Sequence, residues 1–310
     1  MVYNKFSEYL KKRYSKKVYK LPINLPVTCP NRDGNISTYG CIFCGDEGAG
    51  FENLPPSLCV DEQIRINAEH ITAKYKPEKY IIYFQNYSNT YLPIDKFKKY
   101  ISEACVDKVA AIYISTRPDC IYEEQLDFLC WIKHEYKIDV LLELGLQTVN
   151  YKTLKFLNRG HGLAEFVNAV LLLNKYGLEC CAHYIVDLPN DNIDDVIEGA
   201  KIISALKVNQ VKCHSLYILK DTILGDMYEK QVITPVSFDE YVERIITFLE
   251  YLNPEIVIQR LIGRAPKDRT LFCNWGMSWW KIVEMVENKM INERRCQGKY
   301  FDYLRGVKIK

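Results

Sequence analysis

Three cysteines near the N-terminus have a spacing that could hold a metal cluster. Cys29 is separated by eleven residues from the pair Cys41 and Cys44, within the segment LPVTCPNRDGNISTYGCIFC. The intervening residues are rich in Pro, Asn, Asp and Gly, which permit the turns needed to wrap a ligand. No second CxxC or CxxH follows at the distance typical of a closed four-ligand zinc site. Three thiolates instead suit a 4Fe-4S cluster with one open iron, and a merely buried or redox-active CxxC is the alternative.

The remaining cysteines do not form a comparable group. The chain has 310 residues and 12 cysteines, and its charged N-terminus lacks the apolar core of a signal peptide. We therefore expect reduced thiols in a cytoplasmic protein rather than the disulfide framework of a small secreted one. Most of the single cysteines are expected to be small core residues: Cys59, Cys105, Cys120, Cys130, Cys180, Cys181, Cys213, Cys273 and Cys296.

Composition sets limits on partners. The formal net charge is only +2, so no global field attracts nucleic acid or membrane, and any such partner must be met locally. No run approaches eighteen uninterrupted apolar residues, and we expect a soluble protein with no membrane partner. A hydrophobic content of 48% allows one large core.

Short apolar runs alternate six times with segments of helical spacing, which indicates a parallel sheet covered by helices. This pattern fits either a partial TIM-like barrel or a doubly wound sheet, and periodicity does not choose between them. The predicted strands are Ile23 to Thr28, Tyr80 to Phe84, Val109 to Ser115, Val140 to Leu144, Cys180 to Val186 and Val211 to Leu219. The predicted helices are Val60 to Tyr75, Ile94 to Ala104, Tyr122 to Glu135, Ala164 to Tyr176 and Ile193 to Ala205.

The ends of the chain are expected to be additions to this core. We divide the sequence into an N-terminal basic helix (1–20), a core (21–235) and a C-terminal extension packed on it (236–310). The extension is predicted to hold a helix from Phe238 to Leu252 and a strand from Ile256 to Ile262. There is no internal repeat or low-complexity linker.

Four further motifs follow the strands in order: FQNYSNTY at 84–91, STRPD at 115–119, ELGLQT at 143–148 and NRGH at 158–161. With the three cysteines, they make the sequence resemble the radical-SAM superfamily over roughly residues 5 to 265. The resemblance is to the branch of the Elongator catalytic subunit, and within it to short bacterial members that lack the acetyltransferase half. It implies an α/β fold, a partial TIM-like (β/α)6 barrel of parallel strands with a C-terminal extension.

The resemblance also implies the cofactors. A 4Fe-4S cluster on Cys29, Cys41 and Cys44 would bind S-adenosylmethionine (SAM) and cleave it to a 5'-deoxyadenosyl radical. Arg117 is the residue expected to face the substrate instead of the cofactor, and the sequence names no catalytic acid, base or radical-quenching residue. The residues that fall where relatives contact SAM are Phe43, Gln85, Asn86, Ser115, Glu143, Gln147, Arg159 and His183.

One motif departs from the family. Relatives usually have a Gly-Leu-Pro-Gly-Glu run after the fifth strand, and here the segment reads HYIVDLPND, with Asp187 and Asn190 in place of glycines. Because glycine there would permit close backbone approach to the adenosine, the geometry of this loop is left open.

The resemblance implies that the substrate is tRNA, modified on the C5 side chain of the wobble uridine, with a flavodoxin- or ferredoxin-type electron donor. Two basic runs with interleaved aromatics, 11–17 and 294–310, could contact RNA or could be ordinary solvated surface. The alternatives are a radical-SAM oxidoreductase acting on a small metabolite or tetrapyrrole precursor, and a non-enzymatic cluster-binding protein. The oligomeric state cannot be predicted.

Overall fold

The computed structural model describes residues 2–45, 50 and 53–305, and it separates into two compact units. The cysteine-loop unit comprises Ser7–Gly145 and Ala164–Cys181. The C-terminal unit comprises Met1–Phe6, Leu146–Leu163 and Ala182–Lys310. Across the described residues, no helix is both long enough and apolar enough to cross a membrane.

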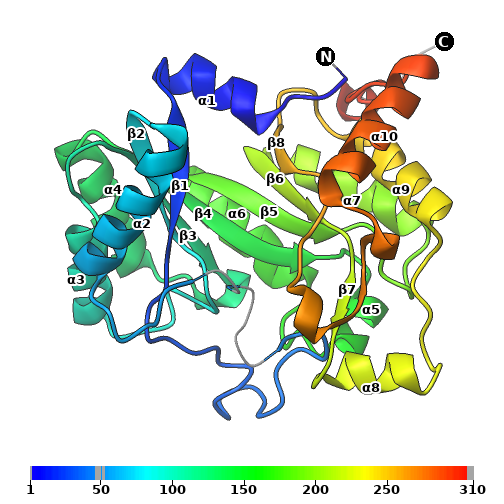
Figure 1. Cartoon of the computed structure of the whole chain (residues 1–310), viewed down its shortest axis with the longest axis horizontal. Coiled ribbons are helices and arrows are strands. Elements are labelled where there is room, and N and C mark those ends of the chain that lie inside the picture. Colours follow the sequence, from blue (N-terminus) through cyan, green and yellow to red (C-terminus); the bar gives the residue numbers. More distant parts are fainter. Residues whose placement is uncertain (1, 46–49, 51–52, 306–310) are drawn as a thin grey trace. The chain divides into compact units, whose positions relative to one another are not determined.

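The strands of the main sheet follow one another in chain order, β1-β2-β3-β4-β5-β6-β8, and the pairs β1–β2, β2–β3, β3–β4 and β6–β8 are parallel (Figure 1). A doubly wound sheet would reverse its order at a switch point, so this order is that of a TIM-like barrel. The strand bounds are β1 Val18–Ile23, β2 Lys79–Phe84, β3 Val109–Thr116, β4 Asp139–Gln147, β5 Glu179–Ile185, β6 Gln210–His214 and β8 Val257–Arg260.

Two predicted strands are wrong in their bounds. The run Ile23 to Thr28 is not a strand, because β1 ends at Ile23, where the backbone turns into the cysteine loop. The run Val211 to Leu219 is broken after His214, and its end forms a separate strand, β7 (Tyr217–Leu219). β7 pairs antiparallel with β9 (Thr270–Cys273), outside the main sheet. Apolar content alone did not reveal these breaks.

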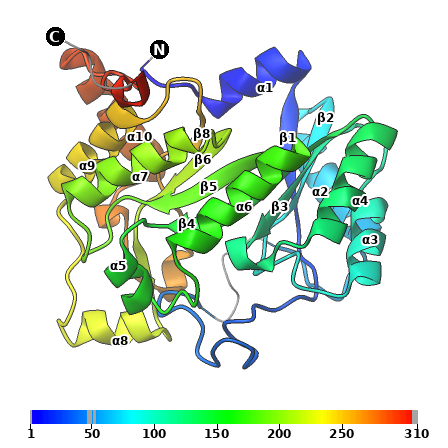
Figure 2. The same cartoon turned by 180° about the vertical axis from the view of Figure 1, so that it is seen from behind.

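The helices match the predicted spacing closely, and α2 and α7 have the predicted bounds. In the cysteine-loop unit, α6 lies across one face of β4, as Figures 1 and 2 both show. It turns Phe166, Val170 and Leu173 inward. The helices are α1 Phe6–Tyr14, α2 Val60–Tyr75, α3 Ile94–Glu103, α4 Glu123–Glu135, α5 Tyr151–Phe156, α6 Leu163–Tyr176, α7 Ile193–Ala205, α8 Ile223–Glu229, α9 Phe238–Tyr251 and α10 Trp279–Asn292.

Strand register decides which side chains share a face. Tyr83 of β2 lies beside Tyr113 of β3, and Ser115 of β3 lies beside Glu143 of β4. Because strand side chains alternate in direction, Tyr113 and Ser115 point to the same face of the sheet. The motifs STRPD and ELGLQT therefore present Ser115 and Glu143 side by side.

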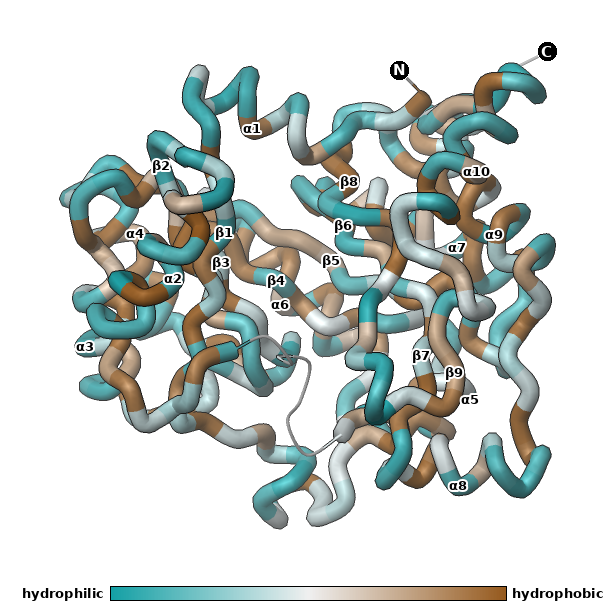
Figure 3. The backbone as a smooth tube through the Cα atoms, viewed as in Figure 1, coloured by the Kyte–Doolittle hydropathy of each residue, from teal (hydrophilic) through white to brown (hydrophobic). Residues whose placement is uncertain are grey.

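The main sheet and the N-terminal helix α1 differ in burial and hydropathy. β3 is buried along its whole length, whereas α1 has no fully buried residue and is coloured mainly hydrophilic in Figure 3. Near-continuous burial is expected of parallel strands with both faces covered. The core of the cysteine-loop unit is thus built from its strands, and α1 adds little to it.

Candidate functional site

The cysteine loop begins after β1 and is folded by its own backbone. The carbonyl of Cys29 accepts from the amide of Arg32 (2.8 Å), and the amide of Cys44 donates to the carbonyl of Cys41 (3.0 Å). Arg32 also donates from Nη1 to the carbonyls of Cys44 (3.3 Å) and Gly45 (3.2 Å). These bonds tie the segment of the first cysteine to the turn that carries the other two.

Gly40 makes the approach of the second cysteine possible. Its φ of +72° lies in the left-handed region, and its amide donates to the carbonyl of Asn31 (2.7 Å). A Cβ there would lie 3.0 Å from the Cγ of Arg32. A side chain at this position would therefore be strained both in its backbone and against Arg32.

Two polar side chains lie near sulfur atoms of the cysteine loop. The Nη1 of Arg117 lies 4.0 Å from the Sγ of Cys29, and the Nδ2 of Asn31 lies 3.6 Å from the Sγ of Cys41. Arg117 is held by a two-point ion pair with Asp119, at 2.9 Å from Nε and 2.7 Å from Nη2. Burial opposes the charge of Arg117, but the bonds to Asp119 and the nearby thiols outweigh it and raise its pKa.

This donor set fits an iron–sulfur cluster. Three thiols on one loop would supply the ligands, while a fixed cation and an amide donor near two sulfurs suit thiolates that carry negative charge. Cys120 is different, although it lies beside Asp119. Burial, followed by the charge of Asp119, raises the pKa of Cys120 to about 12, so it is a neutral thiol rather than a further thiolate.

The loop after β2 carries Gln85 and Asn86, two of the residues expected to contact SAM. Asn86 is 5% exposed and its Nδ2 donates to the Oδ1 of Asn24 (3.0 Å). Asn24 in turn exchanges hydrogen bonds with Gln63 of α2 through its backbone amide and carbonyl. The Oδ1 of Asn86 is buried without a partner, which is an unsatisfied acceptor suited to a ligand's N–H group. Gln85 is half-buried.

Glu143 lies within a polar network on the strand face shared with Ser115. The Nζ of Lys20 from β1 reaches its Oε1 at 2.9 Å, and the carboxylate is fully buried. The same Nζ lies 4.7 Å from the ring centroid of Tyr83 and 4.6 Å from that of Tyr113. The hydroxyl of Tyr83 bonds the Oγ of Ser115 (2.9 Å). Lys20 and both tyrosines were not predicted from the sequence, although the alternation of side chains along a strand could have indicated them.

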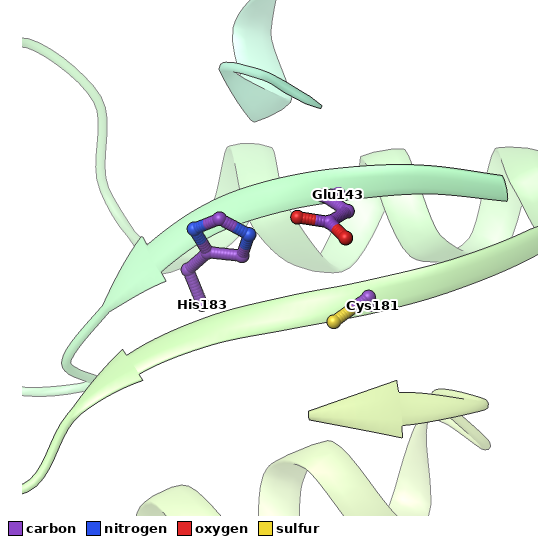
Figure 4. A group of neighbouring side chains, drawn as sticks. All are labelled: Glu143, Cys181 and His183. Atoms are coloured by element: carbon purple, nitrogen blue, oxygen red, sulfur yellow. The ribbon is translucent and has the colours of Figure 1, made fainter. Parts of the chain in front are cut away.

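Glu143 also lies next to Cys181 on the neighbouring strand. Figure 4 shows the carboxylate on β4 and the thiol on β5, and their ligand atoms lie within 4.8 Å of each other. His183 follows two residues after Cys181 on β5 and belongs to the C-terminal unit. Within the cysteine-loop unit, an acid and a thiol therefore share one sheet face, and both groups can contact polar ligands.

Of the other residues expected to contact SAM, Phe43 is half-buried in the cysteine loop, and Gln147, Arg159 and His183 belong to the C-terminal unit. Gln147, the last residue of β4, has a φ of +72°, which is unusual for a residue with a side chain. Arg159 is 7% exposed, and its Nη2 lies 2.8 Å from the Nε2 of His161. The ring of His183 lies 5.2 Å from that of His214, whose Nδ1 is 2.6 Å from the Nη2 of Arg260.

Asp187, which departs from the family pattern, is buried in the C-terminal unit. The amide of Leu216 donates to its Oδ1 (2.8 Å), and its Oδ2 has no partner. Burial raises the pKa of Asp187 to about 7, although the amides of Leu216 and Asp187 and the charge of Arg244 oppose this shift. The carboxyl therefore replaces the open space of a glycine with a buried titratable group.

The basic runs are partly neutralised. Arg13 pairs with Asp139 (2.7 Å) and Glu179 (3.3 Å), and Lys16 pairs with Glu78 (2.7 Å). In the C-terminal run, which is described only to residue 305, the same holds for Arg295 with Glu243 and Glu250 and for Lys299 with Glu250. These ion pairs reduce the positive charge that either run offers to RNA.

Comparison with known proteins places these features in a family. The pattern of the Radical SAM superfamily matches residues 29–203, more than half of the chain, and that of the Radical_SAM C-terminal domain matches residues 208–292. The chain belongs to the radical-SAM superfamily. Its cofactors are accordingly a 4Fe-4S cluster and SAM.

The relatives refine this position. The protein YtqA of Bacillus subtilis is 33% identical over 305 residues, which cover 97% of this chain and 94% of YtqA. The tRNA uridine(34) acetyltransferase of Methanocaldococcus jannaschii is 26% identical over 167 residues, or 53% of this chain and 30% of that protein. The chain is thus similar to the Elongator branch over part of that protein's length.

A solved structure confirms the fold. The Elp3 protein of Methanocaldococcus infernus superimposes with a TM-score of 0.69 at 17% identity, over 90% of this chain and 64% of that one. The expected partial TIM-like barrel of parallel strands is therefore confirmed. The individual ligand and SAM contacts stay predictions.

Proposed function

We propose that the chain cleaves SAM reductively and uses the resulting radical to modify the C5 side chain of the wobble uridine in tRNA. The observation that carries the first part is the cysteine loop, with its three thiols and with Arg117 and Asn31 directed at two of them. The second part is supported by similarity to a tRNA uridine(34) acetyltransferase. When bound, the cluster supplies the electron that breaks a carbon–sulfur bond of SAM.

The residues of this chain have separate tasks in the proposal. Cys29, Cys41 and Cys44 hold the cluster, and Asn86 offers its unpartnered Oδ1 to the amino group of SAM. Arg159 is the group best suited to a carboxylate, because its guanidinium can donate two parallel hydrogen bonds. Burial of Ser115 and Glu143 keeps water from the face on which they lie.

The remaining expected contacts complete the proposal. Phe43 would lie near the adenine, Gln85 beside the methionine, and Gln147 and His183 near the ribose or carboxylate. A flavodoxin- or ferredoxin-type protein would deliver the electron. Acetyl transfer is not part of the proposal, since the match to the acetyltransferase covers only 30% of its length.

The experiment compares SAM cleavage with and without RNA. The protein is purified without oxygen, reconstituted with iron and sulfide, reduced, and assayed for 5'-deoxyadenosine with tRNA from a strain that lacks the gene. We expect tRNA to increase formation at least about tenfold and the nucleoside profile of that tRNA to change on incubation. Stimulation by small metabolites but not by tRNA would contradict the tRNA assignment.

A further inference from the structure

The C-terminal unit exposes two adjacent tryptophans at the start of α10. Trp279 is 41% exposed and Trp280 is 58% exposed. Tryptophan is usually well buried, because its ring contributes more hydrophobic stabilisation than most side chains. With Arg264, Lys267 and Lys281, which are exposed too, these residues form what we call the tryptophan surface.

The pattern of α10 explains why the rings face outward. The helix buries Ile282, Val286 and Met290, which recur every four residues on its inner side. Trp280 and Lys281 precede this row on other faces of the helix, so they stay in solvent. Packing of α10 therefore requires neither of them to be aromatic or basic.

The basic part of the surface comes from the segment between β8 and β9. That segment is anchored at its beginning, where Asn274 donates to the carbonyl of Gly263 (3.1 Å) and accepts from the hydroxyl of Ser215 (2.8 Å). The turn after β9, which leads to α10, is anchored where the Nε1 of Trp275 donates to the carbonyl of Val236 (2.9 Å). The surface is thus held by the fold before any partner arrives.

Arg264 and Trp279 are already stacked. The guanidinium carbon lies 4.0 Å from the ring centroid, within the range of a cation–π contact. A stacked guanidinium keeps its N–H groups at the edge, where they can donate to an anion. Within the described part of the chain, Arg264, Lys267 and Lys281 take part in no ion pair, in contrast to Arg13 and Arg295.

We propose that the tryptophan surface binds an unpaired stretch of the RNA substrate, with a base stacked on Trp280 and phosphates on Arg264 and Lys267. The inference rests on the proposal that RNA is the substrate. Flat aromatic faces between cations are the features that recognise single-stranded nucleic acid. Residues 264–284 contain four basic and two acidic side chains, so the segment is positively charged.

An anionic membrane is the other partner that exposed tryptophans and cations could meet. A membrane-binding helix needs a continuous apolar face toward the lipid. Four of the six exposed positions of α10 after Trp280 are charged or polar and two are apolar: Lys281, Glu284, Met285, Asn288, Ile291 and Asn292. The surface therefore favours RNA, and lipid becomes an outcome of the test.

The test measures binding of the full-length, cluster-loaded protein to an unmodified tRNA transcript with uridine at the wobble position. Trp280→Ala is compared with Trp131→Ala, because Trp131 is 49% exposed on α4 but stacks on Phe128. We expect Trp280→Ala to weaken binding about tenfold and Trp131→Ala less than twofold. Arg264→Ala should also lower the slope of log affinity against log salt by about one.

The outcomes separate this inference from the proposed function. If wild-type protein binds tRNA and Trp280→Ala binds as Trp131→Ala does, the surface is wrong and the tRNA proposal stands. If wild-type protein does not bind tRNA, both are wrong. Binding to phosphatidylglycerol vesicles that is lost in Trp280→Ala, with tRNA binding unchanged, would assign the surface to lipid. Iron content and melting temperature, equal in all variants, exclude misfolding.

Discussion

The surroundings of the cysteine loop in one unit and the tryptophan surface in the other use their charged groups in opposite ways. Near the cysteine loop and its neighbouring strands, Arg117 is bound to Asp119 and Lys20 to Glu143, so these two cations are each fixed beside a specific acid. On the tryptophan surface, Arg264 is exposed and stacks on Trp279, and Lys267 is exposed too. Fixed charges suit the positioning of a cofactor, whereas unpaired charges suit the capture of a large anionic partner. The difference suggests that the charges beside the cysteine loop serve the cofactor and those of the tryptophan surface serve recognition.

The largest expected effect would separate these two roles. Replacing Cys41 and Cys44 together by Ala should remove the cluster's visible absorbance and lower 5'-deoxyadenosine formation more than about a hundredfold. tRNA affinity should change less than twofold, because the tryptophan surface is untouched. The matched control replaces the exposed Cys59 and Cys296 and should keep full iron content. Equal loss of RNA affinity and iron would show that the roles are not divided.

Removing the fixed cation of the polar network tests the first half of the comparison. Lys20→Met leaves the buried carboxylate of Glu143 without this partner and should lower the free energy of unfolding by about 3 kcal/mol. Urea denaturation at pH 7 measures the change. Adding Glu143→Gln should restore most of the loss, since no buried charge then remains. A double variant as unstable as Lys20→Met would mean that packing of the lysine stem matters instead.

The charge of Asp187 is expected to destabilise the C-terminal unit at neutral pH, whereas the pair of Lys20 with Glu143 stabilises the cysteine-loop unit. Its pKa is raised from 3.8 to about 7 on folding. The folded protein therefore holds the proton more tightly, and stability falls as pH rises from about 4 to 7, then stays level. Asp187→Asn removes this loss, so it should stabilise the protein by on the order of 2 kcal/mol at pH 8 and not at pH 4. A gain of equal size at both values would rule out titration as the cause.

The smallest expected effect concerns Cys120. Because its thiol is buried and neutral, Cys120→Ala should leave iron content and the cluster spectrum unchanged and cost about 1 kcal/mol of stability from the small cavity. Iron content is measured for Cys120→Ala and, for comparison, for Cys29→Ala, which should lose the cluster. Loss of iron in Cys120→Ala would instead make this residue part of the metal site.

The features of the protein that depend on spacing along the chain could be predicted from the sequence. The three cysteines and the alternation of strands and helices are spacings along the chain, so the family and the barrel could be predicted. The break after His214 and the pair of β7 with β9 could not, because antiparallel pairing of segments about fifty residues apart leaves no local period. Lys20 was missed because its partner Glu143 is 123 residues away.

The tryptophan surface shows the same limit. From the sequence, the two terminal runs were the candidate RNA contacts, because lysine and arginine are concentrated there. The structure pairs Arg13, Lys16, Arg295 and Lys299 with acids from distant segments. Arg264 and Trp279 are fifteen residues apart and are brought together only by the fold. The concentration of basic residues along the sequence therefore did not predict which of them pair with acids in the folded protein.

Arg117 has a consequence for electron supply. If Cys29 ligates the cluster as predicted, a cation fixed 4.0 Å from its sulfur would stabilise the reduced state, which carries more negative charge. The midpoint potential of the cluster would then lie higher than without Arg117, and a weaker reductant would suffice. Since Asp119 holds the guanidinium in place, this ion pair would help to set which electron carriers could start turnover.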